Sequence, residues 1–248
     1  MAFKKLHGVH VPHRKNTAGA ATVTMDPPSV VTIPVSMHIG APAKPLVKPG
    51  EYVTVGQRIA EVGGFVSSPV HASVSGKVKK IDEMLNSQGR RVPVIVIESD
   101  GKMTRCPDLK PPVINDTEDF LQAMTDSGIV GLGGAGFPTA VKLSPKNMDE
   151  IDILLINGAE CEPYVTSDTI TMMYRADDMG YALQVICSIL GIKKVVIGIE
   201  NNKKRFAKNI SSNREEGEKV FIEKVDDGRC QCDEILKKVQ YYHGKGIP

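Results

Sequence analysis

The chain has 248 residues, of which 41% are hydrophobic and 24% charged, and these ordinary globular values exclude a wholly disordered chain, a collagen and a coiled coil. Its length suits one large or two small domains. Because 31 basic and 29 acidic residues leave a net charge of only +2, and aromatic residues make up 5% with no tryptophan, nucleic acid is not an expected partner.

The cysteine count and the absence of long apolar runs indicate where the chain works. Five cysteines, an odd number at scattered positions, argue against a disulfide framework and favour a reducing, cytoplasmic setting. No apolar run approaches the ~18 residues of a membrane span, and the start at Met1–Lys5 lacks the apolar stretch of a signal peptide. We therefore expect a soluble chain that can dock on a membrane complex.

Residues 1–112 are predicted to comprise an N-terminal segment and a small β-rich unit. Short alternating or β-branched runs punctuated by glycines are typical of strands, and they occur at Val30–Val35, Tyr52–Val55, Val74–Val78 and Val92–Ile97. The Pro111-Pro112 pair marks the linker that follows.

Residues 113–248 alternate between helix and strand. Asp116 or Thr117 can cap a helix to about Asp126, and Gly191 can stop a second one. This alternation predicts an α/β domain with an open parallel, Rossmann-like sheet, and ligands at the carboxyl ends of its strands. The elements after the first helix are a strand at Ile151–Ile156 buried on both faces, a helix over Ser167–Leu190, a strand at Lys194–Ile199, a further helix, and a strand at Val220–Val225.

A dense glycine loop lies between the first helix and the first strand of this domain. Five glycines occur in nine residues, so the backbone can approach a ligand closely and adopt positive φ. Successive N–H groups, a helix start near Pro138 and the charge of Lys142 one turn later favour phosphate binding over a structural loop. The glycines are Gly128, Gly131, Gly133, Gly134 and Gly136.

The segment directly after the Ile151–Ile156 strand is a second candidate site. Asn157 offers both a donor and an acceptor, which suits the edge of a flavin or nicotinamide ring. Glu160 and Glu162 offer acceptors for ribose hydroxyls or an amide. An exposed polar turn remains the alternative for this segment.

Other polar groups carry weaker signals. His7, His10 and His13 recur every three residues, but without a nearby carboxylate we expect a loop and no metal site. The Arg14-Lys15 pair is expected to be solvated surface. No Cys-x-x-Cys motif occurs, so the chain alone is not expected to ligate an iron–sulfur cluster. The cysteines are Cys106, Cys161, Cys187, Cys230 and Cys232.

The Val47–Ala60 string, followed by Ser75–Val78, resembles the hammerhead of biotinyl and lipoyl carrier domains. Residues 61–75 contain no lysine to carry a prosthetic group. The resemblance therefore implies a barrel or sandwich without a swinging arm.

Taken in order, longer strings resemble the C subunit of the Rnf ion-translocating electron transport complex. The glycine loop and the Glu160–Pro163 string are also similar to the flavin-binding subunit of respiratory complex I, which has an arginine where this chain has Leu132. The matching strings are Gly8–Asn16, Ile33–Ala43, Ser75–Val78, Gly128–Leu143 and Ile156–Asp168.

The resemblance implies a noncovalent FMN and an NADH site in the second half. It implies a peripheral subunit on the inner face of the membrane, with other members of the complex as partners. When assembled, this would be part of an NADH:ferredoxin-type oxidoreductase that passes electrons from NADH through FMN to iron–sulfur carriers. Phosphate would be held by Gly131, Gly133, Gly134, Gly136 and Lys142, Phe137 would pack on a ring, and Asn157, Glu160 and Glu162 would address flavin and nucleotide.

The resemblance weakens after Val225. The family continues through a further flavin loop and a domain with 4Fe-4S clusters, whereas this sequence stops at Pro248. We therefore expect a domain truncated at its C-terminus. A non-catalytic docking or assembly fragment that lacks flavin is the alternative to an electron-transfer subunit.

Overall fold

The computed structural model describes residues 12, 14–86, 88–132, 134, 136–160, 162–200 and 220–225. Backbone contacts group these residues into two compact units. The β unit comprises Val23–Lys146 and so includes the glycine loop, and the α/β unit comprises the described parts of Met1–Thr22 and Asn147–Pro248. The domain boundary near residue 112 stays a prediction.

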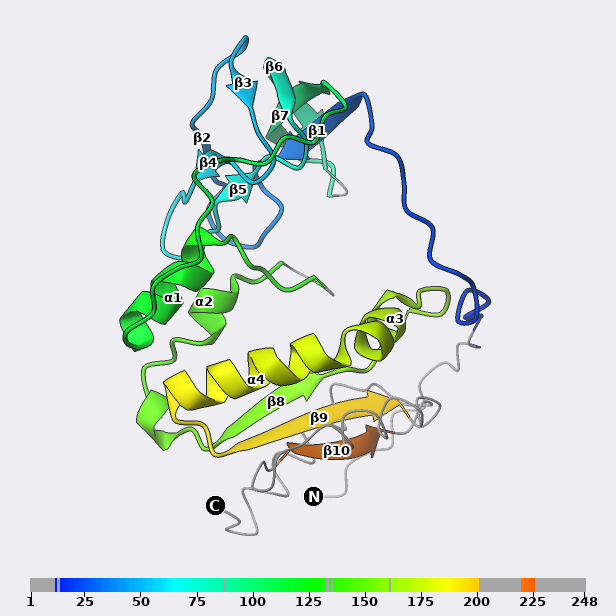
Figure 1. Cartoon of the computed structure of the whole chain (residues 1–248), viewed down its shortest axis with the longest axis vertical. Helices are drawn as coiled ribbons and strands as arrows, with labels where there is room; N and C mark the ends of the chain where they lie inside the picture. The colour runs from blue at the N-terminus through cyan, green and yellow to red at the C-terminus, as the bar shows by residue number, and fades with distance from the viewer. Residues whose placement is uncertain are drawn as a thin grey trace. The chain divides into compact units, whose positions relative to one another are not determined.

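The β unit contains two antiparallel sheets (Figure 1). The first has the strand order β1-β7-β6-β3, and the second has the order β2-β4-β5. All four strand runs predicted for this half contribute a strand, although the third begins at Gly76 and extends to Leu85. The strands are β1 Val30–Pro34, β2 Lys44–Pro45, β3 Tyr52–Val53, β4 Arg58–Glu61, β5 Val70–His71, β6 Gly76–Leu85 and β7 Arg91–Ser99.

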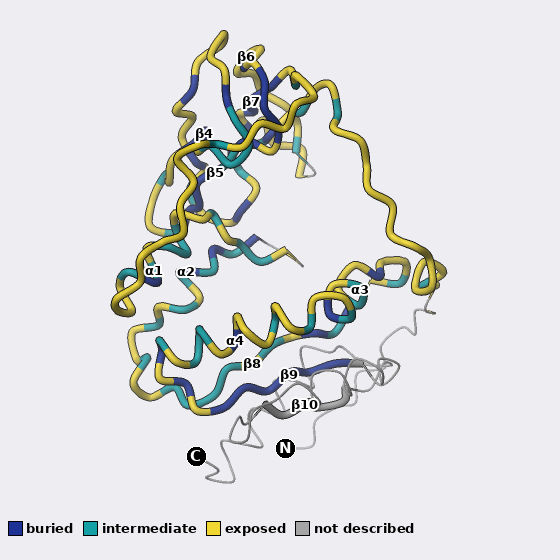
Figure 2. Tube along the Cα trace, viewed as in Figure 1, coloured by how far each residue is buried: buried dark blue, intermediate teal, exposed yellow. Residues whose placement is uncertain are grey.

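The core of the β unit comes from aliphatic residues of its strands and of the adjoining loops, and Figure 2 marks the buried positions along the chain in dark blue. Each such side chain contributes about 1.5–3 kcal/mol when it is fully buried. The sum of these contributions holds the strands together without a disulfide. The largest fully buried side chains of the unit are Val35, Val53, Ile59, Val78, Val94, Ile95 and Ile97.

Two helices follow the strands within the β unit. α1 (Thr117–Asp126) begins as predicted, with the Asp116 carboxylate accepting a hydrogen bond from the Asp119 backbone N–H at 2.8 Å. α2 (Thr139–Lys142) is a single turn that packs against α1. The glycine loop therefore lies between two helices, α1 before it and α2 after it.

The α/β unit has three described parallel strands, in the order β10-β9-β8. α3 and α4 connect β8 to β9 and lie along one face of the sheet (Figure 1). The helix expected between β9 and β10 falls outside the described residues. The elements are a 3-10 turn at Met148–Glu150, β8 Ile153–Asn157, α3 Ser167–Tyr174, α4 Ala176–Leu190, β9 Lys194–Glu200 and β10 Val220–Val225.

Two details of the α/β unit differ from the prediction. The single helix expected over Ser167–Leu190 is broken at Arg175, whose φ of −123° and ψ of 29° are not helical, although Gly191 ends α4 with a φ of +68° as predicted. β8 is also not buried on both faces. Leu154 and Ile156 pack on the core, so Leu155 points to the opposite face, where it is 36% exposed.

Among the described helices, none is both long and apolar enough to cross a lipid bilayer.

Candidate functional site

The glycine loop connects α1 to α2, and its two ends are paired by backbone hydrogen bonds. Val130 and Pro138 form an antiparallel bridge, and the Gly131 N–H donates to the Phe137 carbonyl at 2.9 Å. The Thr139 N–H donates to the Ile129 carbonyl, also at 2.9 Å. These pairings join residues 129–131 to residues 137–139, which are the two ends of the loop.

Lys142 lies over the first part of this loop. A Cβ atom built on Gly131 would be 2.6 Å from Lys142 Nζ, so the ammonium group lies directly beside the Gly131 backbone. Among the described residues, no carboxylate forms an ion pair with Lys142. The ammonium group is therefore available to an anion at the loop.

The loop glycines have different structural roles. Gly136 has a φ of +64°, and a Cβ atom there would lie 2.5 Å from the Met37 carbonyl oxygen. Gly131 and Gly134 do not adopt positive φ, and a Cβ on Gly134 would meet nothing within 4 Å. Gly136 therefore allows the loop to pack closely on the Met37 backbone, whereas Gly134 has open space beside its backbone. Gly133 lies outside the described residues.

The Met37–Ile39 segment, which Gly136 contacts, is held in place by the buried His38. The Ser68 N–H donates to His38 Nε2, so Nδ1 carries the ring proton and donates to the Ile39 carbonyl; both distances are 3.1 Å. These two bonds fix the His38 ring within the Met37–Ile39 segment, which Gly136 approaches closely. Phe137, predicted to pack on a ring, is half-buried next to this contact.

A titratable group lies where the glycine loop begins. Gly128 has a φ of +67°, and a Cβ there would be 3.1 Å from His71 Nδ1. Burial, and then the Arg58 guanidinium, lower the pKa of His71, while Asp126 opposes that shift. Arg58 itself pairs with Asp126 at 2.6 Å. The start of the loop therefore packs on a neutral imidazole.

The loop after β8 carries the second set of predicted residues, all within the α/β unit. The Asn157 side chain is exposed and accepts a hydrogen bond from the Ala159 N–H at 3.1 Å. Glu162 is exposed, whereas Glu160 is buried. Cys161 lies outside the described residues.

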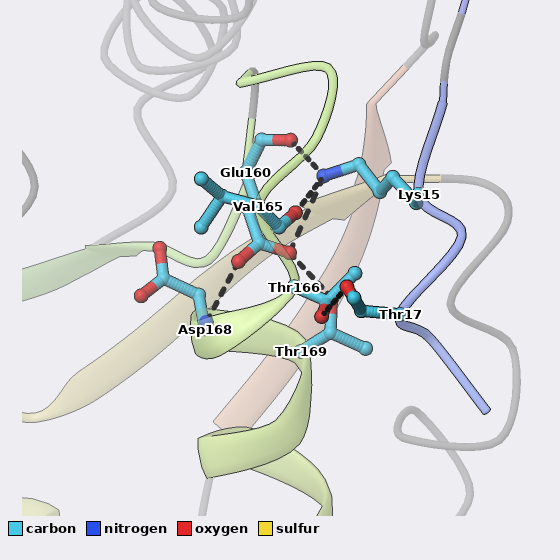
Figure 3. Close-up of polar contacts among 7 residues, drawn as sticks. All are labelled: Lys15, Thr17, Glu160, Val165, Thr166, Asp168 and Thr169. Carbon is cyan, nitrogen blue, oxygen red and sulfur yellow. Dashed lines mark hydrogen bonds and ion pairs between the residues drawn. The ribbon is translucent and has the colours of Figure 1, made fainter. Parts of the chain in front are cut away.

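Glu160 is held by the chain itself (Figure 3). Its carboxylate accepts hydrogen bonds from the Asp168 N–H and the Thr169 hydroxyl, both at 2.7 Å, at the start of α3. Lys15 Nζ lies 3.3 Å from Glu160 Oε2 and donates to the Glu160 carbonyl at 2.7 Å. The Glu160 carboxylate thus accepts a hydrogen bond from a backbone N–H at the N-terminus of α3, and its negative charge is balanced by the positive charge of Lys15.

Lys15 is a residue for which the prediction was wrong. It was expected on a solvated surface, but its side chain is 12% exposed and its ammonium group is paired with the fully buried Glu160 side chain. The local sequence gives no signal for this pair, because the partners are 145 residues apart. The predictions for His7, His10 and His13 fall outside the described residues.

Two family models match the chain in succession. Residues 2–102 match the RnfC barrel sandwich hybrid domain, and residues 124–234 match the Nuo51 FMN-binding domain. The C subunit of the Na+-translocating ferredoxin:NAD+ oxidoreductase complex of Acetobacterium woodii is 45% identical over 200 residues, which are 79% of this chain. The chain belongs to the family of Rnf C subunits.

Further Rnf relatives agree with this assignment. The C subunit of the proton-translocating ferredoxin:NAD+ oxidoreductase complex of Clostridium ljungdahlii is 39% identical over 79% of the chain. The C subunit of the ion-translocating oxidoreductase complex of Rhodobacter capsulatus is 37% identical over 82%. The chain spans less than half of each relative, namely 45% of the first protein, 44% of the second and 40% of the third.

The family match also bears on the fold. The match to the barrel sandwich family model confirms the β-rich barrel or sandwich predicted for the first half, and the two antiparallel sheets agree with it. The parallel β10-β9-β8 sheet confirms an α/β arrangement in the second half. The finer assignment to a Rossmann-like topology stays a prediction.

Proposed function

We propose that this chain is a peripheral electron-transfer part of a membrane ion-translocating complex and binds FMN and NADH. Electrons would pass between NAD(H) and iron–sulfur carriers of the complex. The match to an FMN-binding domain and the ferredoxin:NAD+ names of the relatives support this assignment. The observation that carries it is the ammonium group of Lys142 over the glycine loop, with no carboxylate partner among the described residues.

The glycine loop fits the phosphate of FMN. A phosphate needs close-packed N–H donors and positive charge, and a side chain at Gly134 would occupy the space that a ligand requires. Lys142 adds a full charge, which matters because α2 is one turn long and contributes little dipole. We assign the phosphate to the loop glycines and Lys142, and a ring contact to Phe137. Gly133, Gly134 and Gly136 would contribute N–H groups, whereas Gly131, whose N–H donates to the Phe137 carbonyl, would contribute only the space beside its backbone.

The loop after β8 supplies a different kind of contact. Asn157 and Glu162 are exposed at the carboxyl end of a parallel strand, where open α/β sheets bind ligands. We assign them to the polar edges of flavin and nicotinamide nucleotide. Glu160, whose carboxylate has partners within the chain, contributes by holding this loop.

When bound, FMN supplies the hydride and single-electron chemistry, and the protein supplies binding and orientation. No residue of this chain needs to act as a general acid or base. The electron acceptors are clusters outside this chain, because its cysteines lack cluster spacing. The partners are other subunits of the complex, and the location is the inner face of the cell membrane.

The experiment is an absorbance titration of the purified chain with FMN, followed by addition of NADH without oxygen. The proposal predicts saturable flavin binding and bleaching of the bound flavin by NADH. A chain that folds but binds no flavin would support the alternative, a docking or assembly fragment. Bound flavin that NADH does not bleach would remove the NADH site from the proposal.

A further inference from the structure

The start of the described chain is part of the α/β unit, although the whole β unit, Val23–Lys146, intervenes before that unit resumes. Residues 14–17 run alongside the loop that precedes α3 (Figure 3). The Arg14 N–H donates to the Pro163 carbonyl at 2.9 Å, and the Thr17 and Thr166 hydroxyls share a hydrogen bond at 2.8 Å. The segment is therefore attached to this loop at several points.

Lys15 makes the central attachment. Its ammonium group donates to the Glu160 carbonyl at 2.7 Å and to the Val165 carbonyl at 3.0 Å, and it pairs with the Glu160 carboxylate. One side chain thus joins both ends of the 160–165 loop. Glu162, the exposed carboxylate assigned above to nucleotide, lies between these two anchor points in sequence.

Because the Glu160 side chain is buried, the hydrogen bonds around it are sensitive to the loss of Lys15. The Glu160 side chain has no exposed surface, and a buried carboxylate is costly unless it is paired and hydrogen-bonded. The Asp168 and Thr169 donors supply hydrogen bonds without a full charge. Lys15 adds a full positive charge and holds the loop through the carbonyls of Glu160 and Val165.

We propose that Lys15 is a positioning residue for nicotinamide nucleotide binding, which holds the 160–165 loop so that Glu162 is presented to the ligand. This inference rests on the proposed NADH site. The lysine acts through the loop and does not contact the nucleotide. Its loss therefore has two separable effects: the buried Glu160 carboxylate loses a charged partner, and the loop loses its tether.

The test compares Lys15→Met, the double variant Lys15→Met/Glu160→Gln, and Lys15→Arg. The double variant removes both charges, so it recovers thermal stability that Lys15→Met loses, but it lacks the tether to the two carbonyls. We expect at least a tenfold higher NADH Kd for both variants with methionine, and partial recovery with arginine. Lys193→Met is the matched control, because that lysine is 72% exposed and pairs with Asp152 in the same unit.

Hydrogen–deuterium exchange of the full chain without ligand separates this inference from the proposed function. Amides of residues 162–169 should exchange at least tenfold faster in the double variant than in the wild type, and at the wild-type rate in Lys193→Met. Equal exchange in the double variant and the wild type, or wild-type NADH affinity of the double variant, would overturn the role of Lys15. A wild-type chain that binds no NADH would instead overturn the proposed nucleotide site.

Discussion

Gly131 and Lys142 lie in close contact, since a Cβ atom on the glycine would be 2.6 Å from the ammonium nitrogen of the lysine. Gly131 does not adopt a left-handed backbone, so its contribution here is the close approach that the missing side chain allows. The pair places one full positive charge beside a loop that otherwise offers only N–H groups. That combination is what an anion-binding loop requires.

We predict that Gly136→Ala and Gly134→Ala differ sharply in stability. Alanine at Gly136 would have to adopt positive φ and would clash with the Met37 carbonyl, which costs about 1–3 kcal/mol or more. Alanine at Gly134 meets open space and should stay within about 0.5 kcal/mol of the wild type. Urea unfolding measures both, and equal losses would mean that the loop is not seated on Met37.

Gly134→Val should weaken FMN binding more than Lys142→Ala does. The valine fills the space beside the loop and removes several N–H contacts together, whereas the alanine removes one charged contact. Lys142 is exposed, so its loss should cost about 1 kcal/mol at low salt and less at high salt. FMN titrations at two salt concentrations decide the order, and a salt-independent loss for Lys142→Ala would contradict a role as a point charge.

The pH dependence of stability should include a contribution from His71. Its pKa is lowered in the folded state from the ordinary value of 6.5, so the unfolded chain takes up this proton more readily. The contribution is complete above about pH 6.5 and is lost as the pH falls toward the lowered pKa. His71→Gln should therefore lose less stability than the wild type between about pH 7.5 and about pH 5.5, as measured by urea unfolding. If the unfolding free energies of the variant and the wild type changed equally with pH, His71 would make no contribution to the pH dependence of stability.

Reconstitution of the chain with iron and sulfide should yield no stoichiometric cluster. The five cysteines lack the spacing of cluster ligands, and Cys106 is a free thiol. Iron and acid-labile sulfide analysis of the desalted product measures this. A cluster bound in constant ratio to protein would contradict the assignment of all clusters to other partners.

Local signals predicted much of the fold correctly. The cap at Asp116 and the stop at Gly191 depend on residues within one turn of the helix end, so the sequence places them well. The break at Arg175 was missed, because the flanking residues continue a helical pattern and no proline or glycine marks the site. Propensity alone does not detect such a break.

In the candidate site, too, the sequence predicted what depends on local residues and missed what depends on tertiary contacts. Composition identified the glycine loop and the β8 loop, but it did not distinguish Gly136, which the fold requires, from Gly134, which leaves space for a ligand. Lys15 was missed because its partner Glu160 follows 145 residues later. Only tertiary structure brings these two residues together.

The most direct test of the central claim compares FMN with riboflavin, which differs from FMN by lacking the phosphate. Isothermal titration of the purified chain should give an FMN Kd at least tenfold lower than the riboflavin Kd, a difference of about 1.4 kcal/mol or more. Lys142→Ala should narrow that difference by raising the FMN Kd alone. Equal affinity for the two flavins, or no binding of either by a folded chain, would contradict phosphate binding by the glycine loop.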